Sequence, residues 1–159
     1  TACIPHTDFD DRESFDRAVA TVLDEHAPDL IVLAGFMRIL SPWFVRRYEG
    51  RIVNIHPALL PKYPGLDTHA RVIDAGDSHH GSTVHFVTEE LDGGPRIVAG
   101  RLAVRPGESP EQLMARVQAI EHRIYPQAAQ WFAEGRLRCR DGRAWLDDQP
   151  LDEPVVIDF

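Results

Sequence analysis

The sequence predicts an α/β fold whose sheet is parallel for at least its first part. Short apolar runs alternate with helical patterns at short spacing, which is typical of strands joined by helices. The run Leu30–Leu33 is continuously apolar, as expected for a strand of a parallel sheet covered on both faces. The 159 residues, 43% of them hydrophobic and 26% charged, suit one globular domain. We therefore expect a single domain over residues 1–159.

The first half of the chain is predicted to contain three strands, namely Ile4–His6 (the end of a short strand), Leu30–Leu33 and Ile52–His56. Two helices separate them, Glu13–His26 and Trp43–Tyr48. Asp10 or Asp11 supplies the N-cap of the first helix. Ser41-Pro42 opens the second in the arrangement of an N-cap followed by proline at the first helical position.

The second half is predicted to contain a helix, two strands, a long helix and a hairpin. The helix lies near Thr68–Ala75 and the strands are Thr83–Val87 and Ile97–Val104. The long helix begins at Ser109-Pro110 and continues toward Trp131, with Pro126 inside it or at its break. The hairpin strands are Leu137–Arg140 and Arg143–Leu146, because Asp141-Gly142 between them is a strong two-residue turn signal.

Charge and composition exclude several classes of function. The net charge of −8, with no stripe of Lys and Arg, argues against a nucleic-acid partner. The longest apolar run, Leu30–Met37, is too short to cross a bilayer, and no signal peptide is evident, so we expect a cytoplasmic protein. Cys3 and Cys139 are expected to be free thiols, with a disulfide as the minor alternative. His79-His80 are expected in a polar loop and His85 as a structural histidine, with no metal site.

Asn54 and His56 are the first candidates for chemistry. They stand two apart on a predicted strand, so their side chains share a face, about 7 Å apart along the chain. Pro57 ends the strand there, and ligands of open α/β sheets bind outside the carboxyl ends of strands. An amide and an imidazole so placed could stabilise an oxyanion and move a proton. From spacing alone, a hydrogen-bonded polar pair at a loop junction remains the favoured interpretation.

Two loops supply further candidates. Asp92 precedes Gly93-Gly94, which permit unusual backbone angles and close approach by a ligand. A plain turn is the favoured alternative, because Asp-Gly is a common turn pair. Gly35–Leu40 follows the apolar strand, and its apolar side chains around Arg38 would suit a flat heteroaromatic ligand with a carboxylate. Equally, they could pack into the core.

Three ordered segments, Leu33–Pro42, Asn54–Gly65 and Gly81–Pro95, together resemble the glycinamide ribonucleotide (phosphoribosylglycinamide) formyltransferase family. The resemblance runs from near Thr1 to about Trp145. It implies the formyltransferase fold: a doubly wound, mostly parallel sheet, here lacking its first βαβ unit, with a C-terminal hairpin. Methionyl-tRNA formyltransferase and formyltetrahydrofolate deformylase share the fold and the Asn-x-His…Asp constellation. Their segments after the histidine differ, so they are the runners-up.

The resemblance implies a set of site residues. The catalytic residues would be Asn54, His56 and Asp92. The folate-binding residues would be Arg12, Met37, Arg38, Ile39, Leu40, Asn54, Thr88, Glu89, Glu90, Leu91 and Asp92. The stretch contacting glycinamide ribonucleotide would be Gln118, Ala119, Ile120 and Glu121, of which Ala119-Ile120 departs from the family's more polar pattern.

The implied reaction belongs to purine synthesis and takes its formyl group from 10-formyltetrahydrofolate, with small-molecule substrates and no metal. The amine of 5-phosphoribosylglycinamide would attack the formyl carbon. Asn54 would donate a hydrogen bond to the resulting oxyanion, protonated His56 would act as the acid, and Asp92 would help to relay the proton.

One feature of the family has no counterpart among these residues. The family begins with a βαβ unit whose Gly/Ser/Asn-rich loop holds the substrate phosphate, and no such loop occurs here. The first residue is Thr1 rather than Met, so we expect a fragment whose site is completed by an N-terminal segment or by another chain, as in a homodimer. Alone, residues 1–159 would be poorly stable or self-associating. The alternative from a different class is a non-catalytic folate-binding remnant.

Overall fold

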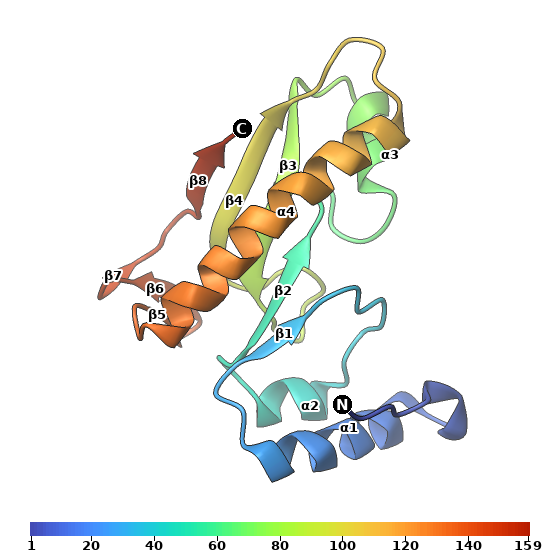
Figure 1. The fold of residues 1–159 in the computed structure, drawn as a ribbon, viewed down its shortest axis with the longest axis vertical. Coiled ribbons are helices and arrows are strands. Elements are labelled where there is room, and N and C mark those ends of the chain that lie inside the picture. The colour runs from blue at the N-terminus through green and yellow to red at the C-terminus, as the bar shows by residue number, and fades with distance from the viewer.

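The structure, a computed structural model, describes all residues from Thr1 to Phe159. In chain order its elements are η1 (His6–Asp8), α1 (Arg12–His26), β1 (Ile31–Leu33), α2 (Pro42–Arg47), β2 (Ile52–His56), α3 (Thr68–Asp74), β3 (His79–Phe86), β4 (Arg96–Ala103), α4 (Pro110–Ala133), β5 (Leu137–Arg140), β6 (Arg143–Leu146), β7 (Gln149–Pro150) and β8 (Val155–Asp158). Figure 1 shows α4 crossing in front of the sheet, with α1 and α2 at its lower end.

The central sheet has the strand order β1-β2-β3-β4-β8. β1 pairs with β2 in parallel, and β4 pairs with β8 in parallel, whereas β3 is antiparallel to both β2 and β4. Four of the five strands therefore point the same way and β3 alone is reversed. This arrangement confirms the α/β class with a mostly parallel sheet.

Helices cover both faces of the sheet. On one face, α4 buries Leu113, Val117, Ile120 and Ile124 in a core shared with Val84, Phe86, Val98 and Leu102. On the other face, Ala20 of α1 and Phe44 and Tyr48 of the α2 region pack with Ile52. Ile52 and Val53 are neighbours on β2 and belong to these two different clusters, because successive side chains of a strand point to opposite faces. The sheet is doubly wound, as expected.

Local capping explains where the helices begin. The Asp11 carboxylate accepts a hydrogen bond from the Ser14 N–H at 2.8 Å, so Asp11 is the N-cap of α1. The Ser41 hydroxyl plays the same part for α2. Ser109 and Gln112 form a reciprocal capping box at the start of α4. These helix starts are confirmed.

The C-terminal hairpin has the predicted bounds, β5 paired with β6. Asp141 and Gly142 both have positive φ, 50° and 69°, as its two-residue turn requires. The sequence did not predict β7 and β8. β7 adds a third strand to the hairpin, and β8 returns to the central sheet beside β4.

Two expectations about the first strands were wrong. Ile4–His6 is not the end of a strand: no strand pairs with it, and the Pro5 carbonyl instead accepts a hydrogen bond from the Asp8 N–H in the turn η1. β1 is a strand of a parallel pair, but it is an edge strand rather than one covered on both faces. Its Val32 side chain is 46% exposed, so the face of β1 on which Val32 lies is not covered.

The expectation that His79-His80 lies in a loop was also wrong, because β3 begins at His79. These residues pair with Ala103 and Leu102 of β4, so the antiparallel ladder continues into a polar stretch that has little strand propensity of its own. As a result His80 is buried, whereas His79 stays exposed.

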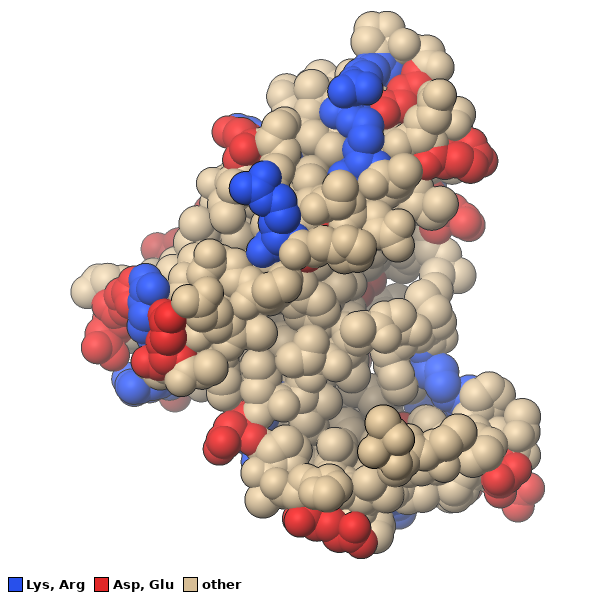
Figure 2. All heavy atoms as spheres, in the orientation of Figure 1, with Lys and Arg blue, Asp and Glu red and all other residues tan.

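The surface carries charges of both signs. On the face drawn in Figure 2, Lys and Arg side chains are interspersed with Asp and Glu and form no continuous stripe. None of the helices has the length and apolar character needed to cross a membrane.

Candidate active site

The carboxyl end of β2 brings three polar side chains together. Asn54 and His56 lie on the same face of β2, as predicted, because they are two residues apart. Asp92 comes from the loop between β3 and β4, and its Oδ2 atom lies 3.4 Å from Nδ1 of His56. The His56 and Asp92 side chains are each only 7% exposed, so this contact is shielded from water.

Asp92 is held by the backbone of two loops. It adopts a left-handed conformation with φ of 53°, which side chains rarely occupy and which turns its carboxylate back toward the sheet. The Gly65 N–H donates to Asp92 Oδ2 at 2.9 Å. Gly94 lies so close to the Phe86 carbonyl that a Cβ there would be 1.9 Å from that oxygen. Glycine is therefore required at position 94, two residues after Asp92, for close backbone approach within the protein.

Hydrogen bonding fixes the orientation of the His56 ring. Its Nε2 atom lies 2.8 Å from the Tyr63 carbonyl oxygen. A carbonyl can only accept, so Nε2 carries a hydrogen and donates it. Nδ1, the nitrogen that gains or loses the second proton, faces Asp92. The imidazolium form satisfies both contacts at once.

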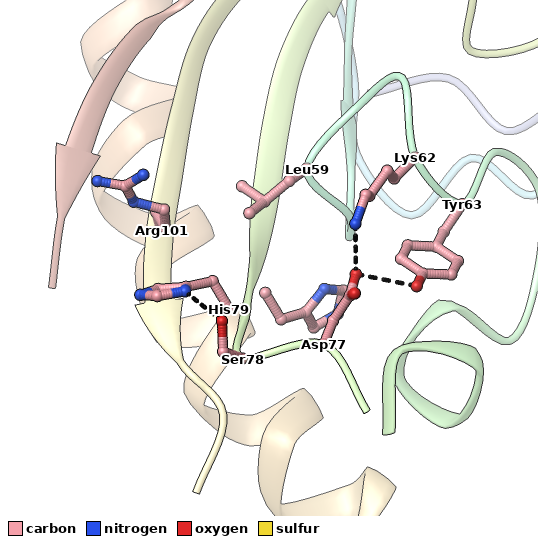
Figure 3. A pocket seen from close by; sticks show the side chains of 8 residues that line it. Leu59, Lys62, Tyr63, Asp77, Ser78, His79 and Arg101 are labelled. Atoms are coloured by element: carbon pink, nitrogen blue, oxygen red, sulfur yellow. Dashed lines mark hydrogen bonds and ion pairs between the residues drawn. The ribbon is translucent and has the colours of Figure 1, made fainter. Parts of the chain in front are cut away.

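Tyr63 also lines a cavity of about 260 Å³. Figure 3 shows its lining, in which Asp77 accepts hydrogen bonds from Lys62 Nζ at 2.8 Å and from the Tyr63 hydroxyl at 2.9 Å. These two bonds lower the pKa of the Asp77 carboxyl, so it stays ionised. The pair Lys62–Asp77 thereby fixes Tyr63, whose carbonyl in turn holds His56.

His85 is a site residue that the sequence did not identify as one. Burial lowers its pKa, so the ring is neutral near pH 7. Its Nδ1 donates to the Phe86 carbonyl at 2.9 Å, which leaves Nε2 to accept from the Asn54 amide at 3.4 Å. Nε2 also lies 3.7 Å from Asp92 Oδ1. The register of β2 and β3 places His85 directly opposite Asn54, and no pattern in the sequence gives that register.

The segment after β1 presents exposed apolar side chains, rather than packing them all into the core. Met37 is 79% exposed and Ile39 is 51% exposed, while Leu40 packs partly against the α1–α2 cluster. The Arg38 guanidinium lies 5.1 Å from the centre of the Phe15 ring. This contact brings the segment beside the first turns of α1, where Arg12 is the first residue.

The loop after β3 continues this surface with residues Thr88–Asp92. Leu91 is 55% exposed, and Glu89 and Glu90 are exposed as well. Glu89 forms an ion pair with Arg46 of α2 at 2.6 Å, and Thr88 is half-buried. One exposed apolar side chain and two exposed carboxylates therefore precede Asp92 in this loop.

The four residues Gln118–Glu121 on α4 have different surroundings. Gln118 and Ala119 are exposed, whereas Ile120 is 3% exposed and packs against Gly100 in the core. Glu121 Oε1 accepts from the Ser82 hydroxyl at 2.9 Å, and Ser82 lies 2.7 Å from the His56 carbonyl oxygen. Burial raises the pKa of Glu121. Of this stretch, the Glu121 side chain is the one linked to β2.

The arrangement is suited to acid–base chemistry on a substrate that develops negative charge on oxygen. An amide donor, an imidazole and a carboxylate lie at one strand end, and the low exposure of the imidazole and the carboxylate strengthens their electrostatic interactions. No group of three or more His, Cys, Asp or Glu side chains is placed to hold a metal ion.

Comparison with known proteins identifies relatives of this chain. A family model described as formyl transferase matches residues 1–129. A phosphoribosylglycinamide formyltransferase of Escherichia coli (strain K12) is 56% identical over 143 residues, covering 90% of this chain and 68% of the relative. The solved phosphoribosylglycinamide formyltransferase of Coxiella burnetii is 48% identical with a TM-score of 0.92, covering 97% of this chain and 73% of that one.

A relative with a different reaction is more distant. The solved formyltetrahydrofolate deformylase of Pseudomonas syringae pv. tomato is 29% identical to this chain, with a TM-score of 0.80. The match covers 86% of this chain and 46% of the deformylase. The deformylase therefore has the same architecture, but a sequence less similar to this chain than those of the two formyltransferases.

Proposed function

The chain belongs to the formyl transferase family, and we propose that it transfers the formyl group of 10-formyltetrahydrofolate to the amine of 5-phosphoribosylglycinamide, a step of purine synthesis. The observation that carries this proposal is the meeting of Asn54, His56 and Asp92 at the end of β2. The 56% identity to the Escherichia coli phosphoribosylglycinamide formyltransferase supports the choice of substrates.

Asn54 and His85 together would stabilise the intermediate. The substrate amine adds to the formyl carbon, and the carbonyl oxygen becomes an oxyanion. The Asn54 amide has two N–H groups, and His85 accepts only one of them. The second is free to donate to the oxyanion. Removing one such donor typically costs a factor of 10²–10³ in turnover, which sets the scale of its contribution.

His56 and Asp92 would handle the proton. As the new carbon–nitrogen bond forms, the amine loses a proton, and as the bond to N10 breaks, that nitrogen gains one. Nδ1 of His56 exchanges its proton next to the Asp92 carboxylate, 3.4 Å away. In its protonated form His56 would also stabilise the oxyanion electrostatically.

The folate would lie along the exposed apolar surface. We assign its ring system to Met37–Leu40 and Thr88–Asp92, with Arg12 and Arg38 offering positive charge to its carboxylates. The exposed Met37, Ile39 and Leu91 side chains support this assignment, because ligand pockets are lined mainly by apolar side chains.

The amine substrate would approach from the side of α4. We assign it to the stretch Gln118, Ala119, Ile120 and Glu121, with Glu121 as the side chain that makes the polar contact. The support is the hydrogen bond from Ser82 to Glu121, which links this helix to the His56 backbone. Ile120 is buried in the core, so its part in the site is to fix the helix.

The proposal also covers the cellular compartment and the competing reaction. We propose that the protein acts in the cytoplasm on small molecules, and the unpaired Cys3 and Cys139 are consistent with a reducing compartment. Hydrolysis of the donor, as in the more distant deformylase, is the competing activity. The two reactions differ in whether an amine or water accepts the formyl group.

The experiment that tests the proposal measures both products. The protein, in its native length, is incubated with 10-formyltetrahydrofolate in the presence and absence of the amine substrate. Formylated amine formed in stoichiometric amounts with tetrahydrofolate supports transfer. Formate released at the same rate with or without the amine would show instead that the chain is a hydrolase.

A further inference from the structure

The Tyr125 hydroxyl joins helix α4 to two neighbouring strands. It lies 2.7 Å from the Leu33 carbonyl oxygen of β1 and 2.9 Å from the Val53 carbonyl oxygen of β2. Both oxygens are acceptors, so the phenol must carry its hydrogen and donate it between them. Burial raises the pKa of Tyr125, which keeps that hydrogen in place at any physiological pH.

The two carbonyl groups belong to residues that precede proposed site residues in the sequence. Leu33 is the last residue of β1 and leads into the segment that carries Met37–Leu40. The Val53 carbonyl belongs to the peptide bond whose nitrogen is that of Asn54. Leu33 and Asn54 are also partners in the β1–β2 ladder. One hydroxyl therefore contacts the backbone four residues before the proposed folate segment and immediately before the proposed oxyanion donor.

On the helix, Tyr125 stands one turn after Glu121. Residues four apart share a helix face, so the turn that carries Glu121 and the turn that carries Tyr125 both face the sheet. Pro126 follows inside the helix and has no N–H, so α4 loses one internal hydrogen bond at this turn. Tyr125 therefore contacts the strands at the turn where α4 lacks one of its internal hydrogen bonds.

We infer that Tyr125 is a positioning residue, which sets the relative placement of Asn54, the Met37–Leu40 segment and the Glu121 turn of α4. The inference rests on the proposed formyl transfer. Its physical basis is that catalysis depends on the placement of reacting groups to fractions of an ångström. Without the hydroxyl, the two hydrogen bonds that tie these carbonyls to α4 are lost.

The test compares two tyrosine variants of the native-length protein. Tyr125→Phe removes the hydroxyl and keeps the ring. Tyr48→Phe is the control, because the Tyr48 hydroxyl, like that of Tyr125, has two acceptors inside the protein: the Ala20 carbonyl at 3.2 Å and Asp24 at 2.7 Å, both on α1. We expect both variants to lose some thermal stability. Only Tyr125→Phe should lower kcat, by about 5- to 20-fold, with KM for either substrate changed by less than about 2-fold.

A second measurement reports the geometry without catalysis. In ¹⁵N-labelled protein, the amide nitrogens of Ala34 and Asn54 belong to the same peptide groups as the two carbonyl oxygens that accept from Tyr125. Their resonances should shift in Tyr125→Phe and stay in place in Tyr48→Phe.

The outcomes separate the inference from the proposed function. Wild-type kcat in Tyr125→Phe, or kcat losses in both variants that follow their losses of stability, would overturn the positioning role. A wild-type protein that transfers no formyl group would overturn the proposed function. In that case the Asn54 amide alone decides the inference: an unshifted resonance refutes it and a shifted one supports it.

Discussion

Nδ1 of His56 and Oδ2 of Asp92 lie 3.4 Å apart, in a contact where each side chain is only 7% exposed. The histidine ends β2, and the aspartate sits in the loop between β3 and β4 with a left-handed backbone. Because the contact is shielded from water, removal of either partner leaves the other buried without its counter-charge. The two residues should therefore act as a unit.

The first prediction concerns this unit. His56→Ala, Asn54→Ala or Asp92→Ala in the native-length protein should each lower turnover by about 10²-fold or more, because each removes a group used in the transition state. Double variants should lose far less than the product of the single losses. Steady-state kinetics measure this, with the exposed histidine variant His79→Ala as the control. Turnover of His56→Ala within a few-fold of wild type would refute the assignment.

The second prediction concerns the folate surface. Met37→Ser should weaken the binding of a non-hydrolysable 10-formylfolate analogue, and replacement of Thr88–Leu91 by Gly and Ser should weaken it further. Met37 is 79% exposed, so this change costs little stability and the effect is one on binding. Met114, which is 49% exposed on α4, provides the control variant Met114→Ser. Calorimetric titration that gives equal affinity for the loop replacement and the wild type would place the cleft elsewhere.

The third prediction concerns acid stability. Burial, together with the neighbouring His69 and His56 rings, lowers the pKa of His80 from 6.5 to about 4. In the unfolded chain His80 takes up a proton near its ordinary pKa, whereas in the folded protein it does so only near pH 4. The stability that His80 contributes is thus complete above about pH 6.5 and is lost as the pH falls toward about 4.

Denaturant unfolding at a series of pH values measures this contribution. His80→Gln keeps a polar group but cannot titrate, so its free energy of unfolding should decline less than that of wild type across the same interval. His79→Gln, one residue earlier and exposed, should follow the wild-type curve. Parallel curves for wild type and His80→Gln would show that His80 does not carry the effect.

The fourth prediction concerns the loop that holds Asp92. Gly94→Ala would place a Cβ 1.9 Å from the Phe86 carbonyl oxygen, so the loop must move. We expect a loss of stability of about 1–3 kcal/mol and a fall in turnover, since Asp92 shifts with the loop. Gly107→Ala is the control: its φ of 72° makes it strained, at a cost of about 1–2 kcal/mol, but its Cβ meets no atom within 4 Å.

Thermal melting and steady-state kinetics on the two glycine variants separate these effects. Gly107→Ala should lose stability and keep wild-type turnover. If Gly94→Ala also keeps wild-type turnover, the backbone approach at Gly94 is not what places Asp92.

The sequence by itself determined the features that depend on neighbouring residues. The Asp11, Ser41 and Ser109 caps act on N–H groups within the next three residues, so the helix starts could be predicted. The Asp141-Gly142 hairpin depends on two backbone angles. Asn54 and His56 share a face of β2 because the side-chain period of a strand is two. The resemblance to a known family named Asp92 as their partner.

Only the tertiary structure decided the features that depend on which strands and helices meet. His85 contacts Asn54 because β3 pairs with β2 in one particular register. His80 is buried because the ladder between β3 and β4 extends as far as His79. The core position of Ile120 and the bridge from Tyr125 to two carbonyls depend on how α4 lies across the sheet. These contacts join residues far apart in the sequence, and their energies come from packing and pairing rather than from local propensity. A pattern read along the chain does not contain them.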